Sequence, residues 1–232
     1  MHAAIALEAA SIPAGAPVAS RDGQIAAVLD GGTGALLTWV GGVPLSATAE
    51  DAGSIGRALG EAHLVLRRTR IADAPPFDWM DCDAPHLDAE PWVRPAVARA
   101  VHEWEGVRHH VSAWGFLHGD PAPEVFRQNG SEGTCGIIDW SSGVDGPCVY
   151  DLASACMYLG RGPGSEVVEA YAAHGPVPLR EIDLALPALL RYRYAVQADY
   201  FARRVAENDL TGLSDPADNQ HGLDDAHEML DG

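Results

Sequence analysis

Two aspartates, each directly after a short apolar segment, constrain this sequence more than any other feature. Asp120 ends the segment "WGFLHGD", and Asp139 ends the segment "CGIID". Apolar runs of this length between polar turn residues predict β-strands. The polar stretch "RQNGSEG" lies between them and has the length of a hairpin turn. We therefore expect the two strand ends, and with them the two carboxylates, to lie side by side.

Such a pair of carboxylates suits phosphoryl transfer. One carboxylate can orient an attacking hydroxyl and accept its proton, while the other holds Mg²⁺ against the phosphate oxygens. Mg²⁺ prefers one or two carboxylates, together with phosphates and water, to a cage of protein ligands. Taken singly, each aspartate could equally be a turn residue at the end of a strand, so the neighbouring motifs decide the interpretation.

Three short motifs in a fixed order make the pattern specific. "LHGD" is followed about 20 residues later by "IIDW", and then by "YDLA". This order resembles the aminoglycoside phosphotransferase and choline kinase family, whose members share the protein-kinase-like fold. The segment "ALLTWVGGVPL" is similar to the last strand and hinge of that family's N-lobe, and "YRYAVQADYFARR" is similar to a late helix of its C-lobe. The resemblance therefore covers nearly the whole chain.

The resemblance implies an α+β, protein kinase-like fold with a mainly helical C-lobe and a truncated N-lobe β remnant. Residues 1–41 would form the remnant of the nucleotide-binding lobe, and residues 42–232 would form the helical catalytic lobe. The cofactors implied are ATP and Mg²⁺. The hinge residues Thr38, Trp39 and Val40 would offer backbone groups to the adenine of ATP.

The resemblance also implies a role for each motif residue. Asp120 would be the catalytic base, and His118 would belong to the same catalytic group by supporting the loop. Asp139 would be the Mg²⁺ ligand. Asp151 of "YDLA" would anchor the catalytic loop, and it could also cap the helix that follows, because aspartate is a favoured N-cap residue.

One departure from the family pattern concerns the second metal ligand. The family places an asparagine five residues after the catalytic aspartate, and this chain has Val125 there. Valine cannot ligate a metal, so Glu124 is the one substitute in "PAPEVF". Glu124 could hold a second Mg²⁺ or could be a loop residue without that role. Asn129 lies too far along the predicted turn to serve.

A second departure concerns the start of the fold. Kinase-like folds begin with a Gly-rich phosphate loop, a strand lysine and a helix glutamate that pairs with it. This chain has no lysine, "DGGTG" is explained by a hairpin turn, and Glu8 lies too close to the end of its helix. We expect the chain to begin inside the N-lobe. Either its natural start lies upstream of Met1, or it is a catalytically impaired pseudokinase or binding module.

The expected elements follow from hydrophobic periodicity and turn residues. Strands are expected at 25–29 and 35–40, with "DGGTG" as the turn, and "GGVP" as a hinge. Helices are expected from Thr48, where Ile55, Leu59, Ala62 and Leu66 share one face, and at about 2–10, 92–108, 149–160, 165–174 and 180–207. Pro187 should restart or kink the last of these. A short terminal helix should follow "QHG".

Charge limits the partners of the protein. The formal net charge is −18, which repels nucleic acid and anionic membranes and favours a small, cationic hydroxyl compound as substrate. The stretch 207–232 holds eight acidic residues and no arginine, and it could be a solvated face or line a pocket for a cationic acceptor. The exposed strand edge near residues 25–40 could drive formation of a homodimer.

Cysteine use and the lack of targeting signals predict a cytoplasmic protein. The four cysteines form no CxxC pair, and the N-terminal stretch has no basic region typical of a signal peptide. A zinc site at Cys82 and His86 has no second ligand pair at useful spacing. A metal-dependent hydrolase that uses His118, Asp120 and Asp139 is a weaker alternative, because it would need further ligands.

Overall fold

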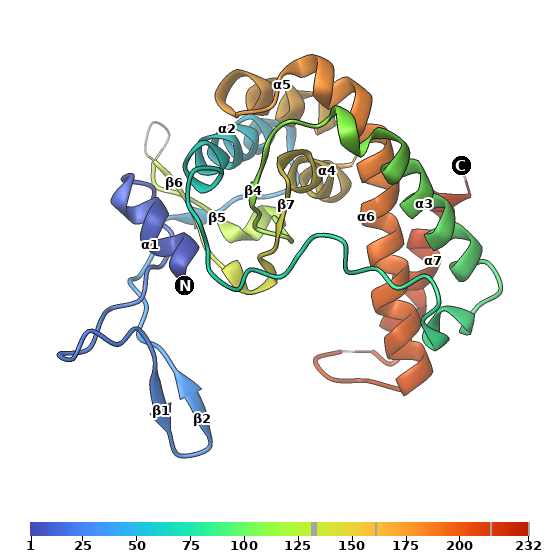
Figure 1. Cartoon of the computed structure of the whole chain (residues 1–232), viewed down its shortest axis with the longest axis horizontal. Coiled ribbons are helices and arrows are strands. Elements are labelled where there is room, and N and C mark those ends of the chain that lie inside the picture. Colours follow the sequence, from blue (N-terminus) through green and yellow to red (C-terminus); the bar gives the residue numbers. More distant parts are fainter. Residues whose placement is uncertain (131–133, 161, 214, 232) are drawn as a thin grey trace. The chain divides into compact units, whose positions relative to one another are not determined.

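The computed structural model describes residues 1–130, 134–160, 162–213 and 215–231. It divides into two compact units. The first combines Met1–Phe77 with Ala113–Leu179, and the second combines Asp78–Ser112 with Arg180–Gly232. Helices dominate and the sheets are short, which is the α+β class that was expected (Figure 1). The domain boundary expected at residue 41 falls inside the first unit and stays a prediction.

The N-terminal segment forms a helix and a hairpin. Helix α1 spans His2–Ala9 as expected. Strands β1 (Ala27–Leu29) and β2 (Gly32–Gly34) pair in antiparallel register around the dipeptide Asp30-Gly31. The expected strand at 35–40 is therefore wrong. An Asp-Gly pair favours a two-residue turn, and Gly31 adopts a φ of 97°, so the returning strand begins inside the stretch expected as turn.

The two segments that carry the aspartates belong to different sheets. Strand β4 (Trp114–Phe116) pairs with β7 (Asp145–Pro147), whereas β6 (Cys135–Ile137) pairs with β5 (Phe126–Gln128). The expectation that one hairpin joins the two segments is wrong, because the chain turns after Asp120 through the 3₁₀ turn η3 (Pro123–Val125) and returns as β5. The polar turn joins β5 to β6 instead, and its residues 131–133 lie outside the described residues. Strand β3 (Val43–Pro44) completes the sheet of β5 and β6, where a hinge was expected.

Three helices build the core of the first unit. Helix α2 (Ala49–Leu66) begins at Thr48, whose hydroxyl accepts the Asp51 N–H at 3.3 Å, and the four apolar residues expected on one face are all buried. Helices α4 (Cys148–Leu159) and α5 (Gly164–His174) occupy the predicted ranges. Gly56 and Gly60 let α2 approach α5 closely. A Cβ at Gly56 would overlap the Val167 carbonyl of α5, and a Cβ at Gly60 would overlap the backbone of Gly175, which follows α5. Helix α4, which carries Asp151, packs against both α2 and α5.

The second unit is helical. It contains the 3₁₀ turns η1 (Pro85–Asp88) and η2 (Arg108–His110) and the helices α3 (Val93–Val107) and α7 (Asp218–Leu230). Helix α6 (Leu179–Glu207) runs without a break through Pro187, so the expected restart there is wrong, while the alternative of a kink stays a prediction. Small side chains such as Ala195, Ala198 and Ala202 bury one face of α6 in the core of this unit, and this packing outweighs the low helix propensity of proline. Helix α7 begins before "QHG" rather than after it.

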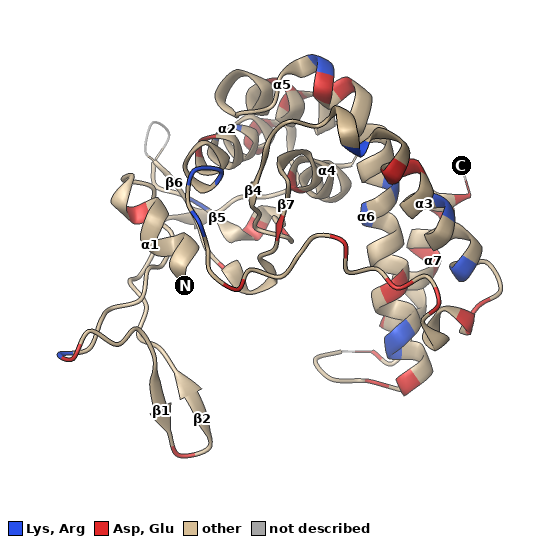
Figure 2. Ribbon diagram, viewed as in Figure 1, with Lys and Arg blue, Asp and Glu red and all other residues tan. Residues whose placement is uncertain are grey.

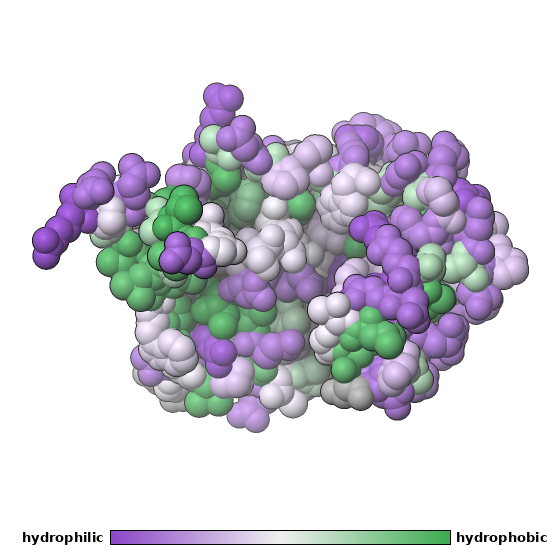
Figure 3. All heavy atoms as spheres, turned by 90° about the horizontal axis from the view of Figure 1, so that it is seen from below, coloured by the Kyte–Doolittle hydropathy of each residue, from purple (hydrophilic) through white to green (hydrophobic). Residues whose placement is uncertain are grey.

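Acidic residues occur in both units, as Figure 2 shows in red. No described helix is both long and apolar enough to cross a membrane. Several large apolar side chains are open to solvent on and after the β1–β2 hairpin: Val28 (89% exposed), Leu36 (71%) and Trp39 (91%). Figure 3 shows apolar side chains in green at the surface of one face of the molecule. Dimer formation through residues 25–40 stays a prediction.

Candidate active site

A buried carboxylate fixes the backbone of the "HGD" loop. Asp151 lies on the first turn of α4 and is 0% exposed. Its Oδ2 accepts the backbone N–H of His118 at 2.7 Å, and its Oδ1 accepts that of Gly119 at 2.9 Å. Gly119 has a φ of 88°, and a Cβ there would overlap the carbonyl of Ser142, so only glycine fits. Helix α4 thereby anchors the residue directly before Asp120.

A histidine from helix α2 completes this anchor. His63 is 1% exposed, and its Nε2 lies 3.0 Å from Asp151 Oδ2 while its Nδ1 lies 2.7 Å from the Tyr171 hydroxyl. A carboxylate only accepts hydrogen bonds, so the Nε2–H of His63 donates to Asp151. Burial, with Cys148 and Asp151 nearby, raises the pKa of Tyr171 well above its usual value, so its phenol remains protonated. The network therefore links α2, α4 and α5 to the loop.

The pKa of Asp151 lies below its usual value. Burial acts to raise this pKa, but the hydrogen bond from His63, the electrostatic effects of His63 and His118, and the Gly119 N–H together outweigh it. A buried carboxylate that accepts several N–H groups is held in its ionised form. Asp151 is therefore a fixed negative charge whose two oxygens hold the backbone of the loop.

His118 connects the loop of Asp120 to the loop of Asp139. The His118 side chain is buried, its Nε2–H donates to the Ile138 carbonyl at 2.8 Å, and its Nδ1 accepts the backbone N–H of Asp120 at 3.3 Å. The imidazole ring also lies 4.9 Å from the indole of Trp140, measured between centroids. The two aspartate loops are thus brought together by a side chain between them rather than by the hairpin that the sequence suggested.

Asp120 is half-buried and is held by a tyrosine that the sequence interpretation missed. The hydroxyl of Tyr158 donates to Asp120 Oδ1 at 2.5 Å. Tyr158 lies seven residues after Asp151 on α4, and this spacing of two helical turns places both side chains on the same face of the helix. That spacing was the available signal. A phenol at this distance from a carboxylate forms a strong, charge-assisted hydrogen bond.

Asp139 sits at a sharp turn where the chain leaves strand β6. Its φ of 64° and ψ of 66° are left-handed, a conformation that aspartate adopts more readily than most residues. The Ser141 hydroxyl donates to Asp139 Oδ1 at 2.6 Å, and the 3₁₀ turn η4 (Trp140–Ser142) follows. The Asp139 carboxylate is exposed. The left-handed backbone turns the chain away from strand β6 at this point and leaves the carboxylate open to solvent.

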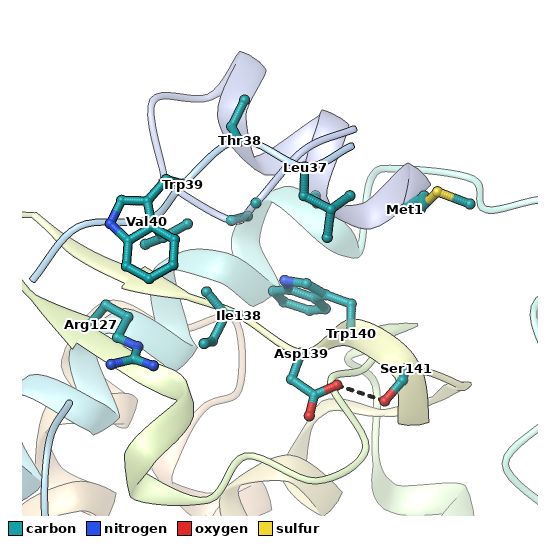
Figure 4. Close-up of a pocket in the computed structure, with 13 residues that line it drawn as sticks. Met1, Leu37, Thr38, Trp39, Val40, Arg127, Ile138, Asp139, Trp140 and Ser141 are labelled. Carbon is teal, nitrogen blue, oxygen red and sulfur yellow. Dashed lines mark hydrogen bonds between the residues drawn. The ribbon is translucent and has the colours of Figure 1, made fainter. Parts of the chain in front are cut away.

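A cavity of about 500 Å³ adjoins Asp139. Residues 37–40 line one side, and residues 138–141 and Arg127 line the opposite side (Figure 4). All three residues expected to contact adenine are therefore in its wall. The Thr38 N–H donates to the Ala16 carbonyl at 2.9 Å, which leaves the backbone groups of Trp39 and Val40 as the better candidates for contacts with a nucleotide base.

The predicted substitute for the second metal ligand is exposed. Glu124 lies in the turn η3, and Val125, at the position of the family's asparagine, is buried. The Val125 carbonyl accepts the Ile138 N–H at 3.0 Å, so the residue ties the two aspartate loops through its backbone. The metal role of Glu124 stays a prediction. The buried side chain of Val125 and the hydrogen bond to its carbonyl hold this loop without the asparagine of the family.

Glu8 has a structural role that the sequence did not predict. Its Oε1 accepts the Ala16 N–H at 2.8 Å and the Thr38 hydroxyl at 2.6 Å. Partial burial opposes the ionised form, but these hydrogen bonds, with help from the Ala14 and Gly15 amides, lower the pKa of Glu8. The carboxylate thus fastens helix α1 to the segment that lines the cavity.

Solved structures of small-molecule kinases share this fold. The chain aligns over 98% of its length with a microcompartment-associated aminopropanol kinase, covering 77% of that chain at 18% identity with a TM-score of 0.70. An amicoumacin kinase bound to AMP-PNP and Ca²⁺ aligns over 97% of this chain and 74% of its own, at 14% identity and a TM-score of 0.68. A choline/ethanolamine kinase family protein from Mesorhizobium loti aligns over 100% and 79%, at 18% identity and a TM-score of 0.65. These similarities establish the kinase-like fold.

Sequence comparison gives the family. Homoserine kinase from Azorhizobium caulinodans is 28% identical over 197 residues, which cover 75% of this chain and 59% of that protein. The chain thus spans less than two thirds of that relative. The model of the phosphotransferase enzyme family matches residues 2–183, which include the motifs "HGD", "IDW" and "DLA". The chain belongs to the phosphotransferase enzyme family, as the order of "HGD", "IDW" and "DLA" indicated.

Proposed function

We propose that this protein transfers a phosphoryl group from ATP to a hydroxyl group of a small molecule. One observation carries the proposal: His118 joins the loop of Asp120 to the loop of Asp139, and the second of these loops borders a cavity of about 500 Å³. Family membership and the solved kinases of the same fold support it.

Asp120 serves as the base in this mechanism. Its carboxylate orients the acceptor hydroxyl and accepts its proton, while the acceptor oxygen forms a bond to the γ-phosphorus and the bond from that phosphorus to the bridging oxygen breaks. ADP leaves with the electron pair of the broken bond. The Tyr158 hydroxyl donates to Oδ1 of Asp120 and thereby fixes the direction of this carboxylate.

The residues at the cavity fit one magnesium ion with the phosphates of ATP. Mg²⁺ takes one or two carboxylates and completes its shell with phosphate oxygens and water, and Asp139 presents an exposed carboxylate at the cavity wall. When bound there, the ion would neutralise charge that develops on the phosphates. Ser141 fixes the direction of the Asp139 carboxylate through its 2.6 Å hydrogen bond.

We propose a small amino alcohol as the acceptor class. The solved relatives include an aminopropanol kinase and a member of the choline/ethanolamine kinase family, and the formal net charge of −18 favours a cation over an anion as substrate. A screen of ADP release with amino alcohols, sugars and aminoglycosides tests this class. Turnover confined to neutral sugars would contradict it.

The hydrolase alternative lacks the side chains that it needs. Within the part of the chain that the structure describes, no three histidine, cysteine, aspartate or glutamate side chains cluster in a way that could hold a metal ion. A hydrolytic metal centre usually takes three protein ligands and keeps one position open. Phosphate release from a phosphomonoester in the absence of nucleotide would revive this alternative.

Mg-ATP should stabilise the protein, and Asp139→Asn should remove most of that effect. A ligand present at 100 times its Kd stabilises the folded state by about 2.7 kcal/mol, which corresponds to a rise in Tm of roughly 5–10 °C for a chain of this size. Thermal unfolding at increasing Mg-ATP concentration measures it. Loss of the free carboxylate weakens metal binding, so the curve of the variant should stay nearly flat.

Asp22→Asn is the matched control, because Asp22 is an exposed carboxylate in a turn of the same unit. It should leave the nucleotide response unchanged. A wild-type protein whose Tm does not change at millimolar Mg-ATP would contradict the proposed function. It would favour the alternative that the protein is a pseudokinase that binds no nucleotide.

Tyr158→Phe should lower kcat about 10- to 100-fold and leave the KM for ATP unchanged. The substitution removes one hydrogen bond to a charged group, which is worth roughly 1.5–3 kcal/mol, while the ring stays in place. Steady-state kinetics with a saturating acceptor separate the two constants. Tyr200→Phe is the control, since Tyr200 is 52% exposed and bonds Arg204. Equal kcat values for Tyr158→Phe and wild type would show that the phenol does not position the base.

A further inference from the structure

One arginine in the cavity wall has no role in the mechanism above. Arg127 lies on strand β5, and its Nε atom is buried with no hydrogen-bond partner among the described residues. Buried donors in folded proteins nearly always have a partner, and those that do not mark a place where water or a ligand completes the bonding. The Nε–H of Arg127 therefore calls for an acceptor that the described residues do not supply.

The strand register explains why Arg127 faces the cavity. Its neighbour Phe126 is 0% exposed, and successive side chains of a strand point to opposite faces, so Arg127 points away from that core. Across the sheet it pairs with Gly136, where a Cβ would overlap Val40 and approach the Pro13 carbonyl. Strands β5 and β6 thus lie directly against the segment of residues 37–40, and Arg127 enters the space beside it.

The cavity wall contains one basic and one acidic side chain, Arg127 and Asp139. In Figure 4 Arg127 and Asp139 both lie on the wall opposite residues 37–40. The guanidinium end of Arg127 points away from the Trp39 indole. The wall formed by residues 37–40 is apolar apart from its backbone and Thr38. A nucleotide with its base at residues 37–40 and its phosphates near Asp139 matches this division.

We propose that Arg127 pairs with a phosphate group of the bound nucleotide. The inference rests on the proposed function. The formal net charge of the chain is −18, so a polyphosphate would approach an acidic protein, and Arg127 is the basic side chain among the described residues that line the cavity. A guanidinium offers a planar fork of donors that matches two phosphate oxygens.

The test compares nucleotides with and without phosphates. We would measure the binding of Mg·AMP-PNP and of adenosine to wild type, Arg127→Met and Arg127→Lys by calorimetric titration. Arg127→Met should weaken Mg·AMP-PNP binding about 10- to 100-fold, the loss expected for charge-assisted hydrogen bonds, and change adenosine binding less than about 2-fold. Arg127→Lys should restore part of the affinity, because it keeps the charge without the fork.

Arg57→Met serves as the control, because Arg57 is an exposed arginine of the same unit that pairs with Glu61 on helix α2. It should bind both ligands like wild type. An equal loss for adenosine and Mg·AMP-PNP would overturn the proposal, since the guanidinium would then contact the base or sugar. Unchanged binding of both would overturn it as well. If wild type binds no nucleotide, the proposed function fails together with this inference, whereas the other two outcomes leave the proposed function standing.

Discussion

Replacing Asp120 by asparagine should lower kcat by about 10²- to 10⁴-fold, the range that a positioned general base contributes. Asparagine keeps the size of the side chain, and its amide oxygen can still accept the hydrogen bond from the Tyr158 hydroxyl at the position of Oδ1. It cannot accept a proton from the acceptor hydroxyl. The effect should therefore appear in the chemical step and not in the binding of Mg-ATP.

Two measurements isolate that step. Single-turnover transfer from ATP reports chemistry directly, and the rise in Tm with Mg-ATP reports nucleotide binding. We expect Asp120→Asn to show the nucleotide response of wild type with almost no transfer, and Asp22→Asn to match wild type in both. A residual rate within a few-fold of wild type would mean that another group takes the proton, and Asp120 would lose its assigned role.

Replacing Asp151 by asparagine should destabilise the protein by about 3–5 kcal/mol, the cost of removing one charge from a buried pair. Both oxygens of Asp151 accept hydrogen bonds, from His118 N–H and His63 on Oδ2 and from Gly119 N–H on Oδ1. Asparagine has only one acceptor oxygen, so one buried donor would face an NH₂ group. Thermal unfolding should show a fall in Tm of roughly 6–20 °C.

The same variant should be less sensitive to acid. The pKa of Asp151 is lower in the folded state than its usual value of about 3.9, so its carboxylate contributes stability above that pH. The contribution disappears as the pH falls through the folded-state pKa. The difference in unfolding free energy between wild type and Asp151→Asn should therefore shrink below about pH 4. Asp145→Asn, at an exposed strand position, should unfold like wild type at every pH, and a constant difference for Asp151→Asn would contradict the ionised anchor.

The neighbouring motifs made the candidate catalytic residues recognisable in the sequence. "HGD", "IDW" and "DLA" are short, and each contains a residue whose chemistry is narrow: a glycine at a positive φ, a carboxylate after a strand, and an aspartate at the start of a helix. The helices were also predictable, because Ile55, Leu59 and Leu66 recur with the helical period and Thr48 can cap them. Such signals are local, so they survive without knowledge of the tertiary structure.

What the sequence alone determined was the identity of the motif carboxylates, the α+β class and the approximate helix positions. Only the tertiary structure decided which strands pair, because partners far apart in the chain, such as β4 with β7, leave no local signal. It also brought His63 and Tyr158 into hydrogen bonds with Asp151 and Asp120, and it placed Arg127 in the cavity wall. These three lie in ordinary helical or strand positions, and their roles depend on the loops that packing brings next to them. Periodicity describes one element at a time, whereas a site is built where several elements meet.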